Sequence, residues 1–218
     1  MVPNLTQWSA EVYFQYTSMP TASQAIFSCG VAADNNIRLA YSNSTSAVTL
    51  QSNAGTNYPI LSDSNEIVKP HHLIITKDNG TVITYLDGVK SVLVTNAAVQ
   101  SPHNGTLNIG SRYSPTKYFA NMNLKMFRFY DGKVLSDEEA LQNYNYETRN
   151  NYVTNGLSLY IDAQDVATQG SIRDISGNRN ITNHGVSTTL NNGCLNFVAS
   201  ESDYIDCGFK PNLTKWSA

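Results

Sequence analysis

The sequence contains no long apolar run, no cluster of basic residues and almost no stretch with helical periodicity. A membrane-spanning helix needs roughly 20 consecutive apolar residues, and no run in the chain approaches that length. The 14 Lys and Arg residues are scattered singly in a chain of net charge −3, so no surface is expected to follow a phosphate backbone. The first residues also have neither the basic head nor the apolar stretch of a signal peptide. We therefore expect no nucleic-acid partner, no membrane insertion and no secretion signal.

Cysteine is also scarce. The three cysteines, Cys29, Cys194 and Cys207, form no CxxC pair, and their odd number leaves at least one thiol free. We expect buried thiols, and a Cys194–Cys207 bridge stays open because sequence alone does not set the Cβ geometry. A chain of 218 residues buries about 70% of its surface on folding. Stability therefore requires no disulfide, metal or cofactor.

Motifs of known catalytic chemistry are missing as well. The chain has no Gly-x-Ser-x-Gly elbow, no Walker loop, no dinucleotide glycine triplet and no Glu-x-Asp-x-x-Glu run. Glu138 and Glu139 are adjacent, so on a helix they point about 100° apart, and acidic residues are common in a first helical turn. His71 and His72 are adjacent in a strand-like run, so they point to opposite faces and do not chelate one metal together. We expect no enzymatic activity.

The chain does contain many short β-branched and aromatic runs separated by Gly, Asn, Asp and Pro. This pattern is typical of an antiparallel sandwich or barrel. The clearest unit, 71–94, predicts three strands joined by turns at 77–80 and 87–88. Further strands are expected at 11–16, 25–28, 38–41, 47–51, 107–111, 124–130, 157–162, 193–198 and 204–207. One short helix is expected near 136–144, because Ser136 can cap it and Glu139 can return a bond to the cap amide.

The two ends of the chain carry a repeat. The segment PNLTQWSA at 3–10 recurs as PNLTKWSA at 211–218, with seven of eight positions identical. Both tryptophans of the chain lie in these two copies. Chance does not plausibly produce such a match, so the chain looks like slightly more than one period of a repeating unit.

Read in the order 155–218 and then 11–147, the chain resembles a laminin-G-like, concanavalin-A-type jelly-roll domain. The residues that carry this resemblance are NGLSLYIDA at 155–163, DISGNRN at 174–180, LNF at 195–197, DYID at 203–206, Trp8 with EVYF at 11–14, HHLIIT at 71–76, YLDG at 85–88, LNIGS at 107–111, and the closing segments 124–130 and 135–139. Val198 and Ala199 stand where the family has Asp and Gly. The resemblance implies an all-β, antiparallel jelly-roll sandwich in circularly permuted order.

The permuted order divides the chain into three parts. Residues 1–147 correspond to the larger, C-terminal part of such a sandwich, 148–154 to a polar linker, and 155–218 to its N-terminal part. The last part alone would expose an apolar face and two open edges. We therefore expect it to complete a sandwich with 1–147 of the same chain or of a neighbouring subunit. The joint at 142–157 resembles the connector between tandem copies of such domains in tailed-bacteriophage structural proteins.

These features lead us to expect a non-enzymatic structural or adhesive module on a virion surface, such as a decoration, fibre or appendage protein assembled in the host cytoplasm. Only one copy of the repeat fits a given sandwich, so the other is free to bind a neighbour as an added strand. The residues expected at that subunit contact are Leu5, Trp8, Leu213 and Trp216. The expected partners are further copies of the chain or other virion proteins.

The alternative function is a carbohydrate-binding lectin module that recognises cell-surface glycans. Tyr58, Tyr113 and Tyr118 lie in segments that read as loops, where aromatic faces could stack on sugar rings. Calcium is the one cofactor that the resemblance implies, because laminin-G-like folds often hold it with carboxylates and carbonyls. Its candidate ligands are Asp162, Asp165, Asp174 and Asp203. The same four residues are equally explained as turn formers.

Overall fold

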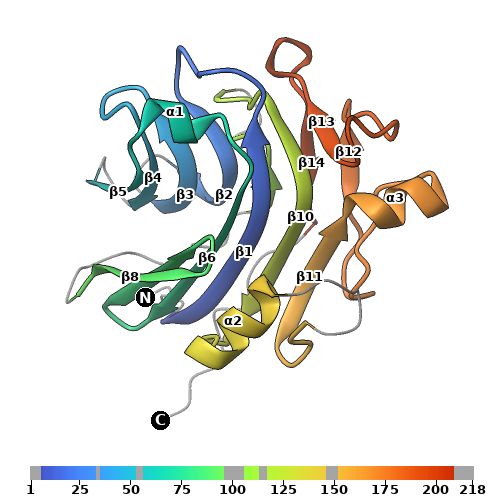
Figure 1. Ribbon diagram of the computed structural model, residues 1–218. Coiled ribbons are helices and arrows are strands. Elements are labelled where there is room, and N and C mark those ends of the chain that lie inside the picture. Colours follow the sequence, from blue (N-terminus) through green and yellow to red (C-terminus); the bar gives the residue numbers. More distant parts are fainter. Residues whose placement is uncertain are drawn as a thin grey trace.

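The computed structural model describes residues 6–32, 35–52, 56–95, 106–112, 117–145 and 152–208. Over these residues the chain forms two antiparallel sheets that pack face to face, with short helices at their margins (Figure 1). The antiparallel β-sandwich expected from the sequence is therefore confirmed.

Each sheet has seven strands. Sheet A has the order β11-β10-β1-β6-β7-β8, with β13 also paired to β10, and sheet B has the order β12-β14-β9-β2-β3-β4-β5. The strands of sheet A are β1 (Gln7–Tyr16), β6 (His71–Asp78), β7 (Thr81–Leu86), β8 (Val89–Val94), β10 (Met122–Asp131), β11 (Leu157–Asp162) and β13 (Leu195–Phe197). The strands of sheet B are β2 (Gln24–Ala32), β3 (Asn35–Ser42), β4 (Ala47–Ser52), β5 (Thr56–Leu61), β9 (Leu107–Ile109), β12 (Thr182–His184) and β14 (Tyr204–Asp206). Strands β11 and β13 pair with β10, and β14 pairs with β9 of the same chain.

The main core lies between the two sheets and follows from the alternation of side chains along β1. Successive side chains of a strand point to opposite faces of the sheet. Every second side chain from Trp8 to Tyr16 enters this core and is at most 1% exposed. The Trp8 ring stacks on the ring of Phe129 in β10, with centroids 6.0 Å apart. The central strand is thereby anchored at its N-terminal end.

A smaller apolar cluster lies on the opposite, outer face of sheet A, beneath helix α2 (Asp137–Tyr144; yellow in Figure 1). Its buried members are Ile74, Tyr85, Tyr130, Leu135, Ala140 and Val153. Val153 falls in the segment 148–154 that the sequence suggests as a linker, yet its side chain is 8% exposed. The cluster fixes α2 on the outer face and so positions one wall of the groove described below.

The expected helix is present as α2, with the expected capping box. The Ser136 hydroxyl accepts a hydrogen bond from the Glu139 amide, and the Glu139 carboxylate accepts one from the Ser136 amide. Glu139 is therefore a capping residue, as its position in the sequence indicated.

The structure adds elements that the sequence did not predict. These are strands β5 and β12, helices α1 (Ser64–Ile67) and α3 (Ala163–Gln169), and a 3-10 turn at Ala199–Glu201. Each of the two helices is short and begins after an aspartate, Asp63 or Asp162, whose carboxylate accepts a bond from the first turn. Helices of four and seven residues carry too little periodicity to be recognised in a sequence.

The meander expected at 71–94 is confirmed, since β6, β7 and β8 pair in succession. Asp87 and Gly88 have φ angles of 50° and 80°, the geometry of a two-residue type I′ turn. A Cβ atom on Gly88 would lie 2.7 Å from a ring carbon of Tyr144. The glycine therefore lets the last residue of α2 pack on this turn.

All three cysteines are free. Cys29 and Cys207 are buried and Cys194 is partly exposed, so Cys194 and Cys207 do not form a bridge. Burial raises the pKa of each thiol. Within the part of the chain that the structure describes, no helix is both long and apolar enough to cross a membrane.

We expect Trp8→Ala to lower the free energy of unfolding by about 3–5 kcal/mol, because it removes a fully buried ring and leaves a cavity. Equilibrium unfolding in denaturant measures the change. Leu141→Ala is the control, because this side chain is 52% exposed and its loss should cost less than about 0.5 kcal/mol. A loss below about 1 kcal/mol for Trp8→Ala would contradict the core described above.

Candidate binding groove on the outer face of sheet A

The residues of β1 that alternate with the core set point to the outer face of sheet A. Glu11 lies opposite Arg128 of β10, and Tyr13 lies opposite His72 of β6. The side chains of Glu11 and Arg128 are both 0% exposed. A complete ion pair is therefore buried on a sheet face that does not belong to the main core.

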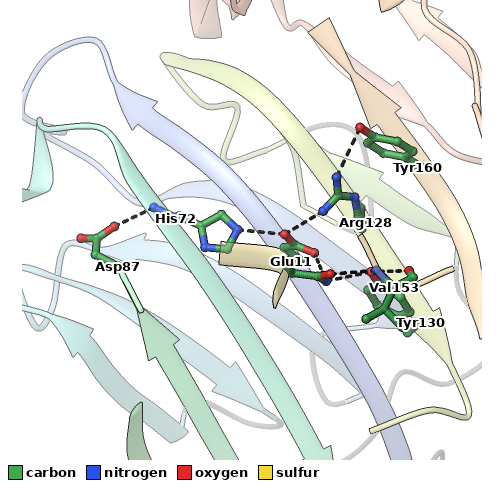
Figure 2. A network of polar contacts seen from close by, with 8 residues as sticks. Glu11, His72, Asp87, Arg128, Tyr130, Val153 and Tyr160 are labelled. Atoms are coloured by element: carbon green, nitrogen blue, oxygen red, sulfur yellow. Dashed lines mark hydrogen bonds and ion pairs between the residues drawn. The ribbon is translucent and has the colours of Figure 1, made fainter. Parts of the chain in front are cut away.

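The Glu11 carboxylate is the centre of a hydrogen-bond network (Figure 2). Its Oε1 accepts bonds from His72 Nε2 at 2.8 Å and from Arg128 Nη1 at 3.0 Å. Its Oε2 accepts a bond from Asn143 Nδ2 of α2 at 2.8 Å. Three elements, β6, β10 and α2, are thus connected through one carboxylate on β1.

The network favours the charged forms of Glu11 and Arg128. Burial alone would raise the pKa of the Glu11 carboxyl, but the charge of Arg128 and the hydrogen bond from His72 outweigh it and hold that pKa below its usual range. Burial likewise disfavours the Arg128 cation, yet the Glu11 charge raises the pKa of the guanidinium on balance. Both groups are charged at neutral pH. Neither can be removed alone without leaving an uncompensated buried charge.

On its other side Arg128 connects the network to β11. Its Nη2 donates to the Tyr160 hydroxyl at 3.3 Å, which donates in turn to Asp162 Oδ2 at 2.6 Å. The guanidinium carbon lies 4.1 Å from the ring centroid of Tyr152 and 4.5 Å from that of Tyr160. These cation–π contacts add to the ion pair and fix the guanidinium plane.

Asn143 of α2 forms hydrogen bonds with Tyr130 of β10 and with Val153, which follows the helix in the chain. Its Nδ2 also donates to the Tyr130 hydroxyl at 3.0 Å, and its Oδ1 accepts a bond from the Val153 amide at 2.9 Å. The Tyr130 hydroxyl donates to the Val153 carbonyl at 3.1 Å. The wall formed by α2 is therefore held by directed bonds as well as by apolar contact.

Beside this wall the outer face is hollowed into a groove with two adjoining parts. The first hollow, of about 250 Å³, is lined by Tyr13, His72, Lys125, Met126, Arg128, Asn143, Tyr144, Tyr160, Asp162 and Gln164. The second, of about 370 Å³, is lined by Tyr13, Phe14, Gln15, Pro70, Asn123, Lys125, Gln164, Asn192, Gly193 and Cys194. Tyr13, Lys125 and Gln164 line both hollows, so the two hollows adjoin, and we refer to them together as the groove.

A β-bulge shapes the floor of the groove. Tyr13 pairs with Met126 and Phe14 pairs with Leu124, so Lys125 has no partner across the ladder. A bulge redirects side chains at the place where it interrupts the ladder. Here Lys125 and Met126 both line the groove, and Lys125 Nζ lies 4.9 Å from the centroid of the Tyr13 ring.

Of the three tyrosines suggested by the sequence for glycan binding, the structure describes Tyr58 and Tyr118, and neither lines the groove. Tyr58 is in strand β5 rather than in a loop, and its ring packs against the main core. The face of the Tyr118 ring lies near the guanidinium carbons of Arg38 and Arg112, at 4.9 and 5.2 Å. Tyr113 lies outside the described residues.

Of the residues suggested for a subunit contact, the structure describes only Trp8, which is fully buried in its own sandwich. Leu5, Leu213 and Trp216 lie outside the described residues.

The four aspartates suggested for calcium are each engaged in local structure. Asp162 caps α3, Asp165 forms an ion pair with Arg173, Asp174 accepts bonds from backbone amides of its own turn, and Asp203 accepts one from an amide five residues earlier. Among the residues that the structure describes, no three His, Cys, Asp or Glu side chains are grouped so that they could hold a metal. The aspartates therefore do not converge on one calcium site.

As functional residues, the sequence analysis considered only two residues of the groove, His72 and Asp162, and each of them as a candidate metal ligand. His72, Arg128 and Asn143 lie 61 to 132 positions along the chain from Glu11, the carboxylate to which all three donate. One signal was present, because Glu11 and Arg128 are charged residues inside two strongly apolar strand patterns. A charge at such a position indicates a buried ionic contact.

Comparison with known proteins places the chain in a family. The profile described as the concanavalin A-like lectin/glucanases superfamily matches residues 2–140. The chain therefore belongs to this superfamily. A search among curated proteins found no match.

Several solved structures are similar in fold. A putative carbohydrate binding protein from Bacteroides ovatus has a TM-score of 0.57 at 16% identity, over 80% of this chain and 51% of that one. Domain 4 of an extracellular arabinanase from Geobacillus stearothermophilus, in complex with arabinotriose, has a TM-score of 0.48 at 20% identity, and the match covers 65% of this chain and 67% of that one. Trypanosoma rangeli sialidase has a TM-score of 0.45 at 15% identity, and the match covers 63% of this chain and 22% of that one. The chain thus spans about a fifth of the sialidase and about half of the Bacteroides protein.

We expect Glu11→Gln to lower the free energy of unfolding by about 3–5 kcal/mol at pH 7, because it leaves the Arg128 charge buried without its partner. The folded-state pKa of Glu11 lies below its ordinary value of 4.5. The contribution of this carboxylate is therefore present above that value and is lost as the pH falls through the folded-state pKa. Denaturant unfolding at several pH values should show the gap between wild type and variant narrowing below pH 4.5.

The matched control is Glu201→Gln, which removes an exposed carboxylate and should change stability by less than about 0.5 kcal/mol. A gap between wild type and Glu11→Gln that stays constant down to pH 3 would contradict a charged, paired Glu11.

Proposed function

We propose that the protein is a carbohydrate-binding module and that its glycan lies in the groove on the outer face of sheet A. The observation that carries this proposal is the combination, in two adjoining hollows of one face, of tyrosine rings with several amide side chains. Ligand sites are typically concave and partly apolar, with a few polar groups that fix orientation. This groove has that composition.

Sugars match both the aromatic rings and the polar side chains of the groove. Tyr13 and Tyr144 offer apolar ring faces with a polar tip, suited to stacking on the carbon–hydrogen face of a pyranose. Around them Gln15, Asn123 and Gln164 line the groove with side-chain amides, and an amide can both donate and accept a hydrogen bond. Gln15 Nε2 already donates to the Val68 carbonyl and Asn123 Oδ1 already accepts from Asn196 Nδ2. Hydroxyl groups of a sugar also do both, so one amide can serve two neighbouring hydroxyls.

The floor of the groove is rigid enough for such recognition. Arg128, Tyr160 and Asn143 are held by the Glu11 network before any ligand arrives. Binding to a site that is already ordered costs less conformational entropy than binding to mobile loops. The likeness to the Bacteroides ovatus protein supports the shared fold alone, so the proposal rests on this geometry.

We propose binding without turnover. A retaining glycosidase needs two carboxylates about 5–5.5 Å apart that both reach the sugar. Among the lining residues that the structure describes, Asp162 is the one carboxylate. It already accepts hydrogen bonds from the Tyr160 hydroxyl and from the backbone N–H of Gln164. Glu11 lies beneath the floor and is 0% exposed.

The setting that we propose is an assembled surface structure of a tailed-phage particle, where a glycan-binding module would serve adhesion. The resemblance of the joint at 142–157 to the connectors of such particles motivates this part of the proposal. Part of that joint, 146–151, lies outside the described residues.

A glycan array probed with the wild-type chain and with Tyr13→Ala tests the function. We expect the wild type to bind a set of related glycans, and Tyr13→Ala to bind the same set at least tenfold more weakly, which corresponds to about 1.4 kcal/mol. The reason is that the Tyr13 ring lines both hollows. Calorimetry with the strongest ligand gives the affinities.

Tyr118→Ala is the matched control, because Tyr118 was suggested by the sequence and lies outside the groove lining. It should leave the affinity unchanged. Loss of binding in Tyr118→Ala with retention in Tyr13→Ala would move the site away from the groove. Absence of binding to every glycan would refute the function.

A further inference from the structure

The two hollows of the groove differ in charge. Among the described residues that line the second hollow, Lys125 is the one charged side chain. The one carboxylate of the groove lining, Asp162, belongs to the first hollow, which also contains Arg128. The first hollow therefore combines both signs of charge, whereas the second offers a positive group alone.

Lys125 is accessible to a ligand. The β-bulge leaves it without a partner across the ladder, and its side chain is exposed in β10, where every other residue is buried or half-buried. Lys69, Lys90 and Lys133 each form an ion pair with a carboxylate. The ion pairs that form among the described residues do not include Lys125. Its charge is therefore open to a carboxylate or another anion from outside the chain.

Two neighbours place the Lys125 ammonium at the second hollow. Its Nζ lies 4.9 Å from the centroid of the Tyr13 ring, and this cation–π contact orients the side chain. Burial raises the pKa of the Cys194 thiol, and the charge of Lys125 opposes that rise. Tyr13 and Cys194 both line the second hollow, so the positive charge acts on that space from within its own lining.

An amide donor accompanies this charge. Asn123 lies two positions before Lys125 in β10 and lines the same hollow. Its Oδ1 accepts a hydrogen bond from Asn196 Nδ2 at 2.9 Å, which leaves the NH₂ end of the amide as the group that can serve a ligand. An ammonium and an amide N–H both donate, and carboxylate or sulfate oxygens only accept. The second hollow therefore suits an anion better than a neutral group.

We infer that the second hollow binds the negatively charged group of an acidic glycan, a carboxylate or a sulfate ester, with Lys125 as its counter-ion. This inference rests on the proposed glycan-binding function and names the class of sugar that the groove recognises. The chain as a whole carries a net charge of −3, so an acidic glycan depends on a local positive group to approach this surface.

Calorimetry with matched pairs of ligands tests the inference. The carboxylate probes are tetrasaccharides of galacturonate, of mannuronate and of hyaluronan, each paired with its carboxyl-reduced form. The sulfate probe is a carrageenan tetrasaccharide paired with its desulfated form. We expect the wild-type chain to bind the anionic member of at least one pair about tenfold more tightly than the neutral member. The pair that shows this preference identifies the anionic group.

Substitutions at Lys125 connect the preference to this residue. Lys125→Gln keeps a polar side chain at an exposed position, so it should not impair folding. We expect it to reduce the preference for the anionic ligand to less than about twofold, whereas Lys125→Arg should retain a clear preference because it keeps the charge. The wild-type preference should also decrease as the salt concentration rises.

Lys117→Gln is the matched control. It removes the same charge from an exposed lysine that does not line the groove, so the wild-type preference should persist.

Alkylation of Cys194 tests the local charge without any glycan. Cys194 is partly exposed, whereas Cys29 and Cys207 are buried, so Cys194 should react first. Iodoacetate is an anion and iodoacetamide is neutral, and a positive charge beside the thiol favours the anionic reagent. The ratio of the two rate constants should fall by about twofold or more in Lys125→Gln, and should not change in Lys117→Gln.

Three results would overturn the inference. The first is a wild-type chain that binds neutral glycans as tightly as their anionic counterparts. The second is a preference that persists in Lys125→Gln, and the third is a ratio of alkylation rates that this substitution leaves unchanged. In each of these cases the proposed function still stands if Tyr13→Ala weakens glycan binding. Failure of the wild-type chain to bind any probe or any glycan of the array would refute both.

Discussion

The outer face of sheet A is organised by the buried Glu11 carboxylate. An exposed sheet face usually carries solvated polar side chains, but here helix α2 and the segment around Val153 cover part of it and remove the ion pair from water. A buried charge of this kind is tolerated only with several well-placed donors. Glu11 has three, from His72, Arg128 and Asn143. The requirement to satisfy one carboxylate therefore fixes the position of the helix and, with it, one wall of the groove.

The sequence predicted most of the local structure. Strands, the 71–94 meander and the α2 capping box each depend on neighbouring residues, so their signals are local in the chain. Short elements such as β5 and α3 escaped, because a few residues hold too little pattern.

The groove was not predicted from the sequence, for a different reason. The partners of the Glu11 carboxylate beneath its floor lie 61 to 132 positions away in the chain, and strand register decides which of them meet. The bulge at Lys125 adds to the difficulty, since it breaks the alternation that would assign a face to that residue. The loop tyrosines suggested by the sequence had a local signal, but Tyr58 packs on the core and Tyr118 lies against two arginines.

Strand β1 contributes to both faces of sheet A. Trp8 and the side chains that alternate with it enter the main core, whereas Glu11, Tyr13 and Gln15 supply the network and the groove on the outer face.

The most direct measurement is a map of amide chemical shifts during titration with the strongest glycan from the array. If the groove is the binding site, the perturbed amides will cluster around Tyr13, Lys125, Tyr144 and Gln164, on four different elements of one face. Perturbations that cluster around Tyr118, beside strands β2 and β3 of sheet B, with none in the groove, would contradict the central claim.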